Sequence, residues 1–304
     1  MRICSQKLFY KAVVSVLLAL PLFVLSCEKE SGDKGPVDTG GPTTAACGWM
    51  ELPEDKSSDD LHFVKHFMTF NGKLVRNWSC CYSYSDKISY WVAYPLNKGL
   101  KGAKTGRTND WAYDPDVPSQ YQYNISYSFG GGYDRGHQLP SADRNINSEI
   151  NASTYYSTNM TPQKSGFNKN IWQVLEQNVR GWATASDTLY VLTGAVRGTK
   201  TTGGVNIPSA YFKALLRYSS AGTVGTDGFA GIAFWFDHEQ YGSYDYYMQP
   251  ISKDMAISLA ELEEKLQYEL FPNLRMKIGV TKAEKVKNQD PSKLEWWWRG
   301  WPEY

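Results

Sequence analysis

Four runs of branched aliphatic and aromatic residues place the strongest constraint on the fold of this 304-residue chain. Each run is short and is bounded by Gly, Pro, Asn or Asp, which is the pattern of a β-strand. The runs are Ile88–Leu96, Thr188–Val196, Tyr211–Tyr218 and Phe229–Phe236. A chain whose apolar residues are concentrated in such runs is expected to have a β-sheet at its centre.

Two segments show helical periodicity instead. Apolar residues recur at helical spacing from 168 to 183. A second pattern begins at Ser258, which forms a capping box with Glu261, and Pro272 ends it. Strands outnumber helices and the two do not alternate regularly. The sequence therefore predicts an α+β fold with a mainly antiparallel central sheet flanked by helices.

Residues 1–26 are predicted to be a signal peptide. Basic residues precede an apolar run from Ala12 to Leu25, which is too short for a membrane span of about 20 residues. The run ends in Val24-Leu25-Ser26-Cys27, which resembles the lipobox of bacterial lipoproteins, where the cysteine is acylated and becomes the mature N-terminus. The alternative is an ordinary signal peptide that ends near a cysteine. We expect lipidation at Cys27 and a location at the bacterial cell envelope, periplasmic or on the cell surface.

Residues 27–46 are expected to form a flexible tether, because they contain no aromatic residue and a single branched aliphatic, Val37. No internal repeat and no second linker follows, so residues 47–304 are expected to form one domain. Segment 27–60 has a net charge of −6, which masks a charge of +4 in residues 61–304. That excess is too small to indicate a nucleic-acid partner by itself.

The predicted domain contains three cysteines. In an oxidising compartment Cys47 pairs with Cys80 or with Cys81, and the sequence leaves both pairings open. No CxxC spacing occurs, which argues against a zinc site.

The segment from 133 to 180 concentrates polar residues whose chemistry suits phosphodiester hydrolysis. A neutral histidine takes a proton from water, an asparagine oxygen suits hydrated Mg²⁺, and arginines match the geometry of phosphate. The segment contains Asp134-Arg135-Gly136-His137, then Asn159-Met160-Thr161-Pro162-Gln163, and then Asn168, Glu176 and Arg180 on the predicted helix.

These motifs resemble the signature of the DNA/RNA non-specific endonucleases, a family of the ββα-metal or His-Me finger superfamily. The resemblance extends over about residues 85–275 and includes Trp91–Leu96, Arg107 and Pro208–Lys213. It implies a ββα-metal motif in the fold and cleavage of DNA and RNA without sequence specificity. It also implies a divalent metal cofactor, Mg²⁺ or another such ion, for example Mn²⁺.

Position by position, the resemblance implies a role for each motif residue. His137 would be the general base, Asn168 the direct ligand of Mg²⁺, and Glu176 the group that holds metal-bound water. Arg107 would stabilise the transition state. Arg135 and Arg180 would contact phosphate or brace the site.

Asp134 and Asn159 would support these groups. Some members have a further asparagine four residues before Asn159, but this chain has Tyr155 there, which puts one supporting contact in doubt.

Each assignment has a structural alternative. His137 is then a buried structural histidine, Asn168 a helix cap, and Glu176 with Arg180 a surface pair at i,i+4 spacing. At the level of function, the alternatives are a protein of nuclease fold that binds nucleic acid or a surface partner without cutting, and a hydrolase of other phosphodiesters.

Two further patterns are interpreted as structural. His62 and His66 have the spacing of a helical zinc pair but lack the Glu of HExxH. The tryptophans near the C-terminal end, Trp296, Trp297, Trp298 and Trp301, are expected to pack against the domain rather than to stack on bases.

Overall fold

A computed structural model describes residues 47–56, 58–101, 105–243 and 251–300. The predicted signal peptide, the tether, Cys27 and Trp301 lie outside these residues. Among the residues described, no helix has the length and apolar character that crossing a bilayer requires.

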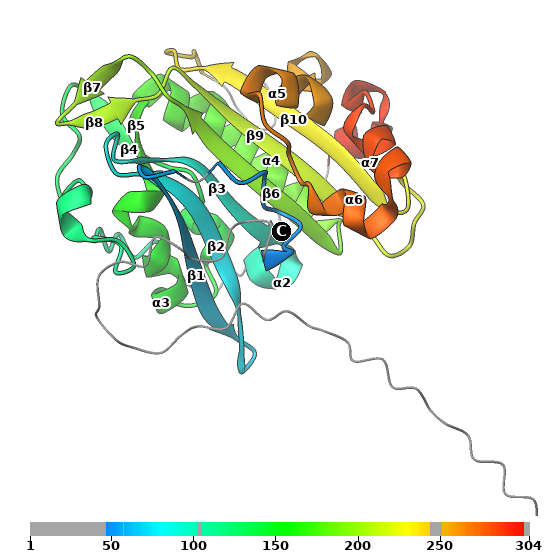
Figure 1. Cartoon of the computed structure of the whole chain (residues 1–304), viewed down its shortest axis with the longest axis horizontal. Helices are drawn as coiled ribbons and strands as arrows, with labels where there is room; N and C mark the ends of the chain where they lie inside the picture. Colours follow the sequence, from blue (N-terminus) through cyan, green and yellow to red (C-terminus); the bar gives the residue numbers. More distant parts are fainter. Residues whose placement is uncertain (1–46, 57, 102–104, 244–250, 301–304) are drawn as a thin grey trace, which may run out of the picture.

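A seven-stranded sheet runs through the molecule in the order β1-β2-β3-β6-β9-β10-β11 (Figure 1). Every neighbouring pair in it is antiparallel. The four predicted strands are β3, β6, β9 and β10, so the predicted fold class is confirmed. The strand bounds are β1 Leu61–Phe70, β2 Lys73–Ser83, β3 Ile88–Leu96, β6 Thr188–Val196, β9 Ala210–Tyr218, β10 Phe229–Asp237 and β11 Ala256–Ile257.

The β1–β2 hairpin was not predicted, although its turn carries a clear signal. Asn71 and Gly72 both have positive φ, 50° and 73°, as a tight hairpin turn requires. The turn end of this hairpin projects from one edge of the sheet in Figure 1. Two shorter hairpins lie outside the main sheet: β4 Tyr133–His137 with β5 Met160–Lys164, and β7 Lys200–Thr202 with β8 Val205–Ile207.

Helices cover both faces of the sheet, which explains why its central strands are apolar on both sides. One face packs against α4 (Gln173–Thr184) and the C-terminal tryptophans, of which Trp296 and Trp297 are buried, so their predicted packing role is confirmed. The other face packs against α5 (Leu259–Leu266), α6 (Asn273–Ile278) and α7 (Val280–Lys287). Of two further helices, α3 (Ser148–Ala152) lies within the segment that connects β4 to β5, and α2 (Lys98–Lys101) lies next to the Ser141–Arg144 turn of that segment.

The predicted capping box of α5 is present. The backbone N–H of Glu261 donates to Ser258 Oγ at 3.1 Å, and the backbone N–H of Ser258 donates to Glu261 Oε2 at 2.7 Å. The helix ends at Leu266, before Pro272, because Gln267 adopts a left-handed conformation with φ of 58°.

Neither expected pairing of Cys47 forms. Cys80 and Cys81 carry reduced thiols, and as neighbours on a strand they point to opposite faces of the sheet. Cys47 shares its apolar cluster with Cys81.

Candidate active site

A β-hairpin followed by a helix carries the polar motifs. β4 pairs antiparallel with β5, which places His137 opposite Met160. The chain then enters a π-helical turn, Phe167–Trp172, that continues into α4. This is the ββα arrangement that the resemblance implies. The π-helical turn contains Asn168. Such turns are rare in proteins overall, and those that occur often lie at functional sites.

Glycines allow the close packing of this hairpin. Gly130, Gly131 and Gly132 all have positive φ, which lets the chain turn sharply into β4. At Gly136, a Cβ atom would lie 2.1 Å from the side chain of Gln163, so the two strands approach too closely for any larger residue.

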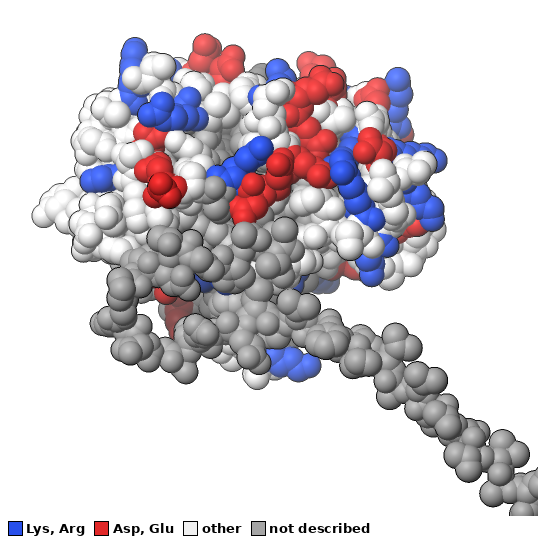
Figure 2. All heavy atoms as spheres, viewed as in Figure 1, with Lys and Arg blue, Asp and Glu red and all other residues white. Residues whose placement is uncertain are grey.

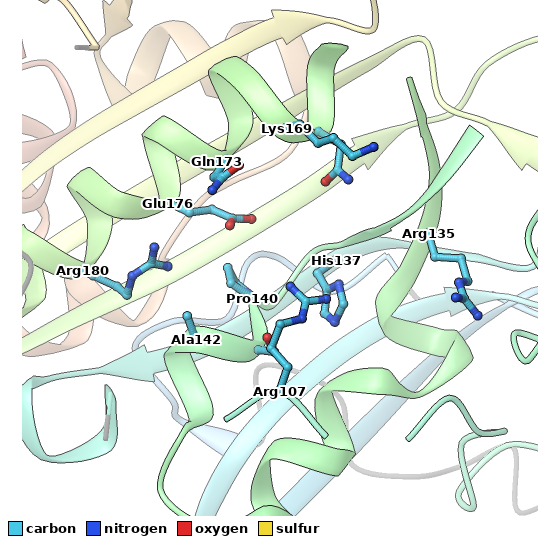
Figure 3. Close-up of a pocket in the computed structure, with 11 residues that line it drawn as sticks. Arg107, Arg135, His137, Pro140, Ala142, Lys169, Gln173, Glu176 and Arg180 are labelled. Carbon is cyan, nitrogen blue, oxygen red and sulfur yellow. The ribbon is translucent and has the colours of Figure 1, made fainter. Parts of the chain in front are cut away.

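A cavity of about 320 Å³ lies between the hairpin and α4. Figure 3 shows Gln173, Glu176 and Arg180 on the α4 side and His137 with Arg107 on the opposite side. The predicted site residues divide into two groups. Asp134 and Asn159 are not among the lining residues, whereas the lining includes Arg107, Arg135, His137, Asn168, Glu176 and Arg180.

His137 is buried, with 9% of its surface exposed, and its Nε2 has no hydrogen-bond partner among the described residues. Burial, reinforced by the positive charges of Arg107 and Arg135, lowers the pKa of His137 to about 3. The imidazole is therefore neutral at pH 7. A neutral imidazole has one nitrogen that is able to accept a proton.

Aromatic rings hold this imidazole in place. The ring of Tyr155 meets the ring of His137 edge-on, at 4.9 Å and 89°, and Trp111 lies 5.7 Å away. Tyr155 itself is fully buried. The position at which some relatives carry an asparagine therefore contributes an aromatic contact here.

Asn159 fixes the backbone that follows His137. Its Oδ1 accepts a hydrogen bond from Leu139 N at 2.8 Å, and its Nδ2 donates to Leu139 O at 2.9 Å and to Thr154 O at 2.7 Å. This position suits the supporting role that the resemblance implies.

Asn168 lines the cavity. Its Nδ2 donates to Asp134 Oδ2 at 3.0 Å, which orients the amide and leaves Oδ1 for a ligand. With the carboxylate of Glu176 on the same cavity wall, the donor set is oxygen only. Such a set, with room for water, suits a hydrated Mg²⁺ ion.

Arg180 is braced from the side. Its Nη1 donates to Asp143 Oδ1 at 3.2 Å, and Tyr94 Oη donates to Asp143 Oδ2 at 2.9 Å. Burial raises the pKa of Glu176, whereas Lys213, Arg180 and Arg107 act in the opposite direction. The half-buried carboxylate of Glu176 and the buried guanidinium of Arg180 thus lie together on α4, and Asp143 holds Arg180 from outside that helix.

Arg135 is stacked on Trp111, with 3.7 Å from its guanidinium carbon to the ring centroid. Its Nη1 donates to Ile125 O at 2.9 Å and to Ser126 O at 3.2 Å, so one end is tied to the loop before β4. Arg107 is exposed, and its guanidinium lies 5.7 Å from the ring of Tyr155.

A separate group, His66, Asp114 and Asp116, brings its potential ligand atoms within 4.8 Å of one another, close enough to hold a metal ion. His66 Nε2 lies 3.0 Å from Asp114 Oδ2 and Nδ1 lies 3.3 Å from Asp116 Oδ2. Burial lowers the pKa of His66, but the two carboxylates outweigh burial and raise it to about 9. A protonated imidazole donating to two carboxylates explains this group without a metal, and its residues do not line the cavity.

Comparisons with known proteins agree with this geometry. Residues 60–276 match the sequence model of a family described as DNA/RNA non-specific endonuclease. The chain belongs to this endonuclease family. A protein named nuclease from Nostoc sp. is 30% identical over 285 residues, which cover 91% of this chain and 98% of that protein. The human mitochondrial nuclease EXOG is 25% identical over 214 residues, covering 65% of this chain and 56% of its own.

The fold of this endonuclease also occurs in a crystal structure of an EndoG/EndoGI complex. The TM-score is 0.57 at 18% identity, over 71% of this chain and 89% of that one. Together these findings confirm the family, the enzyme class and the fold predicted from the sequence.

The motifs did not predict three residues of the endonuclease's site. Trp111 and Asp143 brace arginines, and Lys213 lies beside Glu176. Lys213 had a visible signal, since it is a lysine within an otherwise apolar strand, AYFKALL. Its neighbours, however, come from distant parts of the chain.

Proposed function

We propose that this endonuclease hydrolyses phosphodiester bonds of DNA and RNA without sequence preference, with Mg²⁺ as cofactor and His137 as general base. The observation that carries the proposal is the joint placement of three groups in one cavity. These are the neutral imidazole of His137, the amide oxygen of Asn168 and the carboxylate of Glu176.

The charge of the cavity suits a phosphate. Its lining has four cationic side chains (Arg107, Arg135, Lys169 and Arg180) against the single carboxylate of Glu176. The opposite side of the molecule, with α5–α7, mixes both signs of charge (Figure 2). A backbone phosphate is therefore drawn to the cavity, and contacts to the backbone carry no base information.

In the proposed reaction, the neutral imidazole of His137 takes a proton from a water molecule as the water oxygen attacks phosphorus. The bond from phosphorus to the leaving oxygen breaks, and Arg107 and Arg135 stabilise the charge that grows on the phosphate oxygens. Asn168 Oδ1 would hold a divalent ion, and Glu176 would hold its water. A bound ion supplies further positive charge beside the phosphate.

The test is cleavage of supercoiled DNA and of RNA by the purified protein, with Mg²⁺ and with excess EDTA. We expect both substrates to be cut with Mg²⁺ only. His137→Ala should lose nearly all cleavage, and a control variant of a histidine outside the cavity, His62→Gln, should keep it. Undiminished cleavage by His137→Ala, or by the wild type in EDTA, would refute the proposal.

Two other outcomes would identify the alternatives. Binding of DNA without cleavage would indicate a degenerate binding protein. Hydrolysis of small diesters but of no polymer would indicate another phosphodiesterase.

For the location, we propose export and anchoring through a lipid on Cys27, from the lipobox-like sequence alone. Cys27→Ser should move the protein from the membrane fraction to the soluble fraction. An unchanged distribution would contradict the anchor.

A further inference from the structure

The loop before β4 carries every exposed aromatic ring of the described residues. The exposed Tyr, Phe and Trp side chains there are Tyr113 (42%), Tyr121 (38%) and Tyr127 (69%). Residues 117–133 include no charged side chain and consist largely of Tyr, Ser, Asn, Gln and Gly. Tyrosine rings beside small polar groups provide a large contact area at a low cost in conformational entropy. Such a surface suits a ligand that has flat apolar faces.

Tyr121 is held in place for stacking by its neighbours. Its ring is nearly parallel to that of Tyr84, with 4.1 Å between the centroids and 9° between the planes. Its backbone O accepts a hydrogen bond from Tyr82 Oη at 3.0 Å, and Tyr82 is fully buried. These contacts fix one face of the Tyr121 ring against the protein. A flat ring placed on the other face would continue the stack, and little further ordering of the protein would be needed.

The same loop touches the cavity through Arg135. Arg135 lines the cavity, and its Nη1 donates to Ile125 O at 2.9 Å and to Ser126 O at 3.2 Å. Tyr127 is the next residue along the chain. Ser126 Oγ also donates to the backbone O of Trp111 at 3.5 Å, and the ring of Trp111 carries the stacked guanidinium of Arg135. The exposed tyrosines therefore belong to a loop that is tied to one end of the cavity.

This end of the cavity lies where the chain of a bound nucleic acid would leave it. Figure 3 shows Arg180 and Arg135 at opposite ends of the cavity, with His137 between them. A phosphate beside His137 has a nucleotide on each side along the strand. The nucleotides that leave the cavity past Arg135 meet the loop that carries Tyr127.

We propose that Tyr113, Tyr121 and Tyr127 form a base-stacking surface for unpaired nucleotides next to the scissile phosphate of single-stranded DNA or RNA. Every base has a flat face, so stacking on tyrosine tolerates any sequence. In a duplex, neighbouring base pairs cover these faces, so the surface favours single strands. The uncharged segment 117–133 leaves phosphate binding to the arginines of the cavity. The inference rests on the proposed function, because it takes nucleic acid as the substrate.

The experiment measures binding without cleavage. Fluorescence anisotropy in excess EDTA follows labelled oligothymidylate, an abasic oligomer of the same length and a DNA duplex. Tyr121→Ser and Tyr127→Ser each remove one ring, whereas Tyr121→Phe and Tyr127→Phe retain it. Leu74→Ser is the matched control, because Leu74 is 63% exposed but lies beside the turn of the β1–β2 hairpin, at the opposite end of that hairpin from Tyr84.

We expect wild type to bind oligothymidylate more tightly than the abasic oligomer or the duplex. Each Ser variant should bind oligothymidylate about fivefold or more weakly, because it loses the stacking of one base. The Phe variants and Leu74→Ser should bind it as wild type does. Tyr127 is the most exposed of the three tyrosines, so Tyr127→Ser tests the proposal even if Tyr121→Ser loosens the packing on Tyr84.

Two results would overturn the proposal. One is that wild type binds oligothymidylate no more tightly than the abasic oligomer, or binds neither. The other is an unchanged affinity for oligothymidylate in Tyr127→Ser, which would leave a protein partner as the ligand class that suits these exposed tyrosines.

Cleavage gives a second readout and separates this inference from the proposed function. With Mg²⁺, Tyr127→Ser should raise KM for a single-stranded substrate more than KM for duplex DNA, and the effect should fall on KM rather than on kcat. Because the anisotropy measurement needs no turnover, a wild type that cuts nothing would refute the proposed function and leave the binding test decisive. Intact cleavage without any preference for bases over the abasic backbone would refute the stacking surface alone.

Discussion

The protonation state of His137 makes a prediction about stability that is independent of catalysis. Burial lowers the pKa of His137 to about 3 in the folded protein, whereas the pKa of a histidine in an unfolded chain is about 6.5. As the pH falls below about 6.5, the unfolded state binds a proton and the folded state does not. The contribution of His137 to stability is therefore lost progressively from about pH 7 to about pH 3.

The stability lost at pH 5 follows from the difference between pH 5 and the pKa of histidine in the unfolded chain. One pKa unit corresponds to about 1.36 kcal/mol, and pH 5 lies about 1.5 units below 6.5, so the loss at pH 5 is about 2 kcal/mol. In the folded protein His137 is still neutral at pH 5. The loss of stability therefore depends mainly on the pKa of histidine in the unfolded chain. We expect wild type to lose about 2 kcal/mol more than His137→Gln between pH 7 and pH 5.

The assay is urea denaturation followed by tryptophan fluorescence, with EDTA present, for both proteins at both pH values. Two other histidines, His66 and His238, also titrate. Both proteins contain them, so their contributions to the free energy of unfolding cancel when wild type is compared with His137→Gln. Burial lowers the pKa of His238 to about 4, and the carboxylates around His66 hold its pKa near 9 against burial. If wild type and His137→Gln lost equal stability between pH 7 and pH 5, the conclusion that His137 is a buried neutral imidazole would be refuted.

Three further predictions concern the site and its support. Gly136→Ala should cost about 1–3 kcal/mol and slow cleavage, because its Cβ would meet Gln163; a wild-type melting temperature and rate would contradict this. Asn168→Ala should cut poorly at low Mg²⁺ and recover partly at high Mg²⁺ with unchanged stability, and a wild-type dependence of rate on Mg²⁺ would argue against a ligand role. Arg144→Met should cost about 3–5 kcal/mol in urea denaturation, because fully buried Arg144 donates to the side chain and the backbone of Asn77; an unchanged midpoint would count against that account.

Local sequence signals identified the strands that are buried on both faces. β3 and β6 match their predicted ranges because continuous apolar runs mark such strands directly. The β1–β2 hairpin was not predicted because polar residues such as His62 and His66 interrupt β1 at the spacing of a helix, so that β1 is neither a continuous apolar run nor a strict alternation.

The site was predictable to the extent that its residues lie in one continuous segment. His137, Asn168 and Glu176 come from the β4–β5–α4 unit, where spacing along the chain determines proximity. The contact of Lys213 with Trp172 and that of His66 with Asp114 join residues far apart in the sequence. Such contacts depend on how the elements pack, which no local pattern encodes.

The general base can be tested most directly by chemical rescue. His137→Gly leaves a space where the imidazole was, and imidazole added to the solution should restore cleavage of DNA in the presence of Mg²⁺. We expect the restored rate to rise with the concentration of neutral imidazole, and therefore with pH, while the wild-type rate does not respond to imidazole. A folded His137→Gly protein that imidazole fails to reactivate, or one that cuts as fast as wild type without it, would contradict the role of His137.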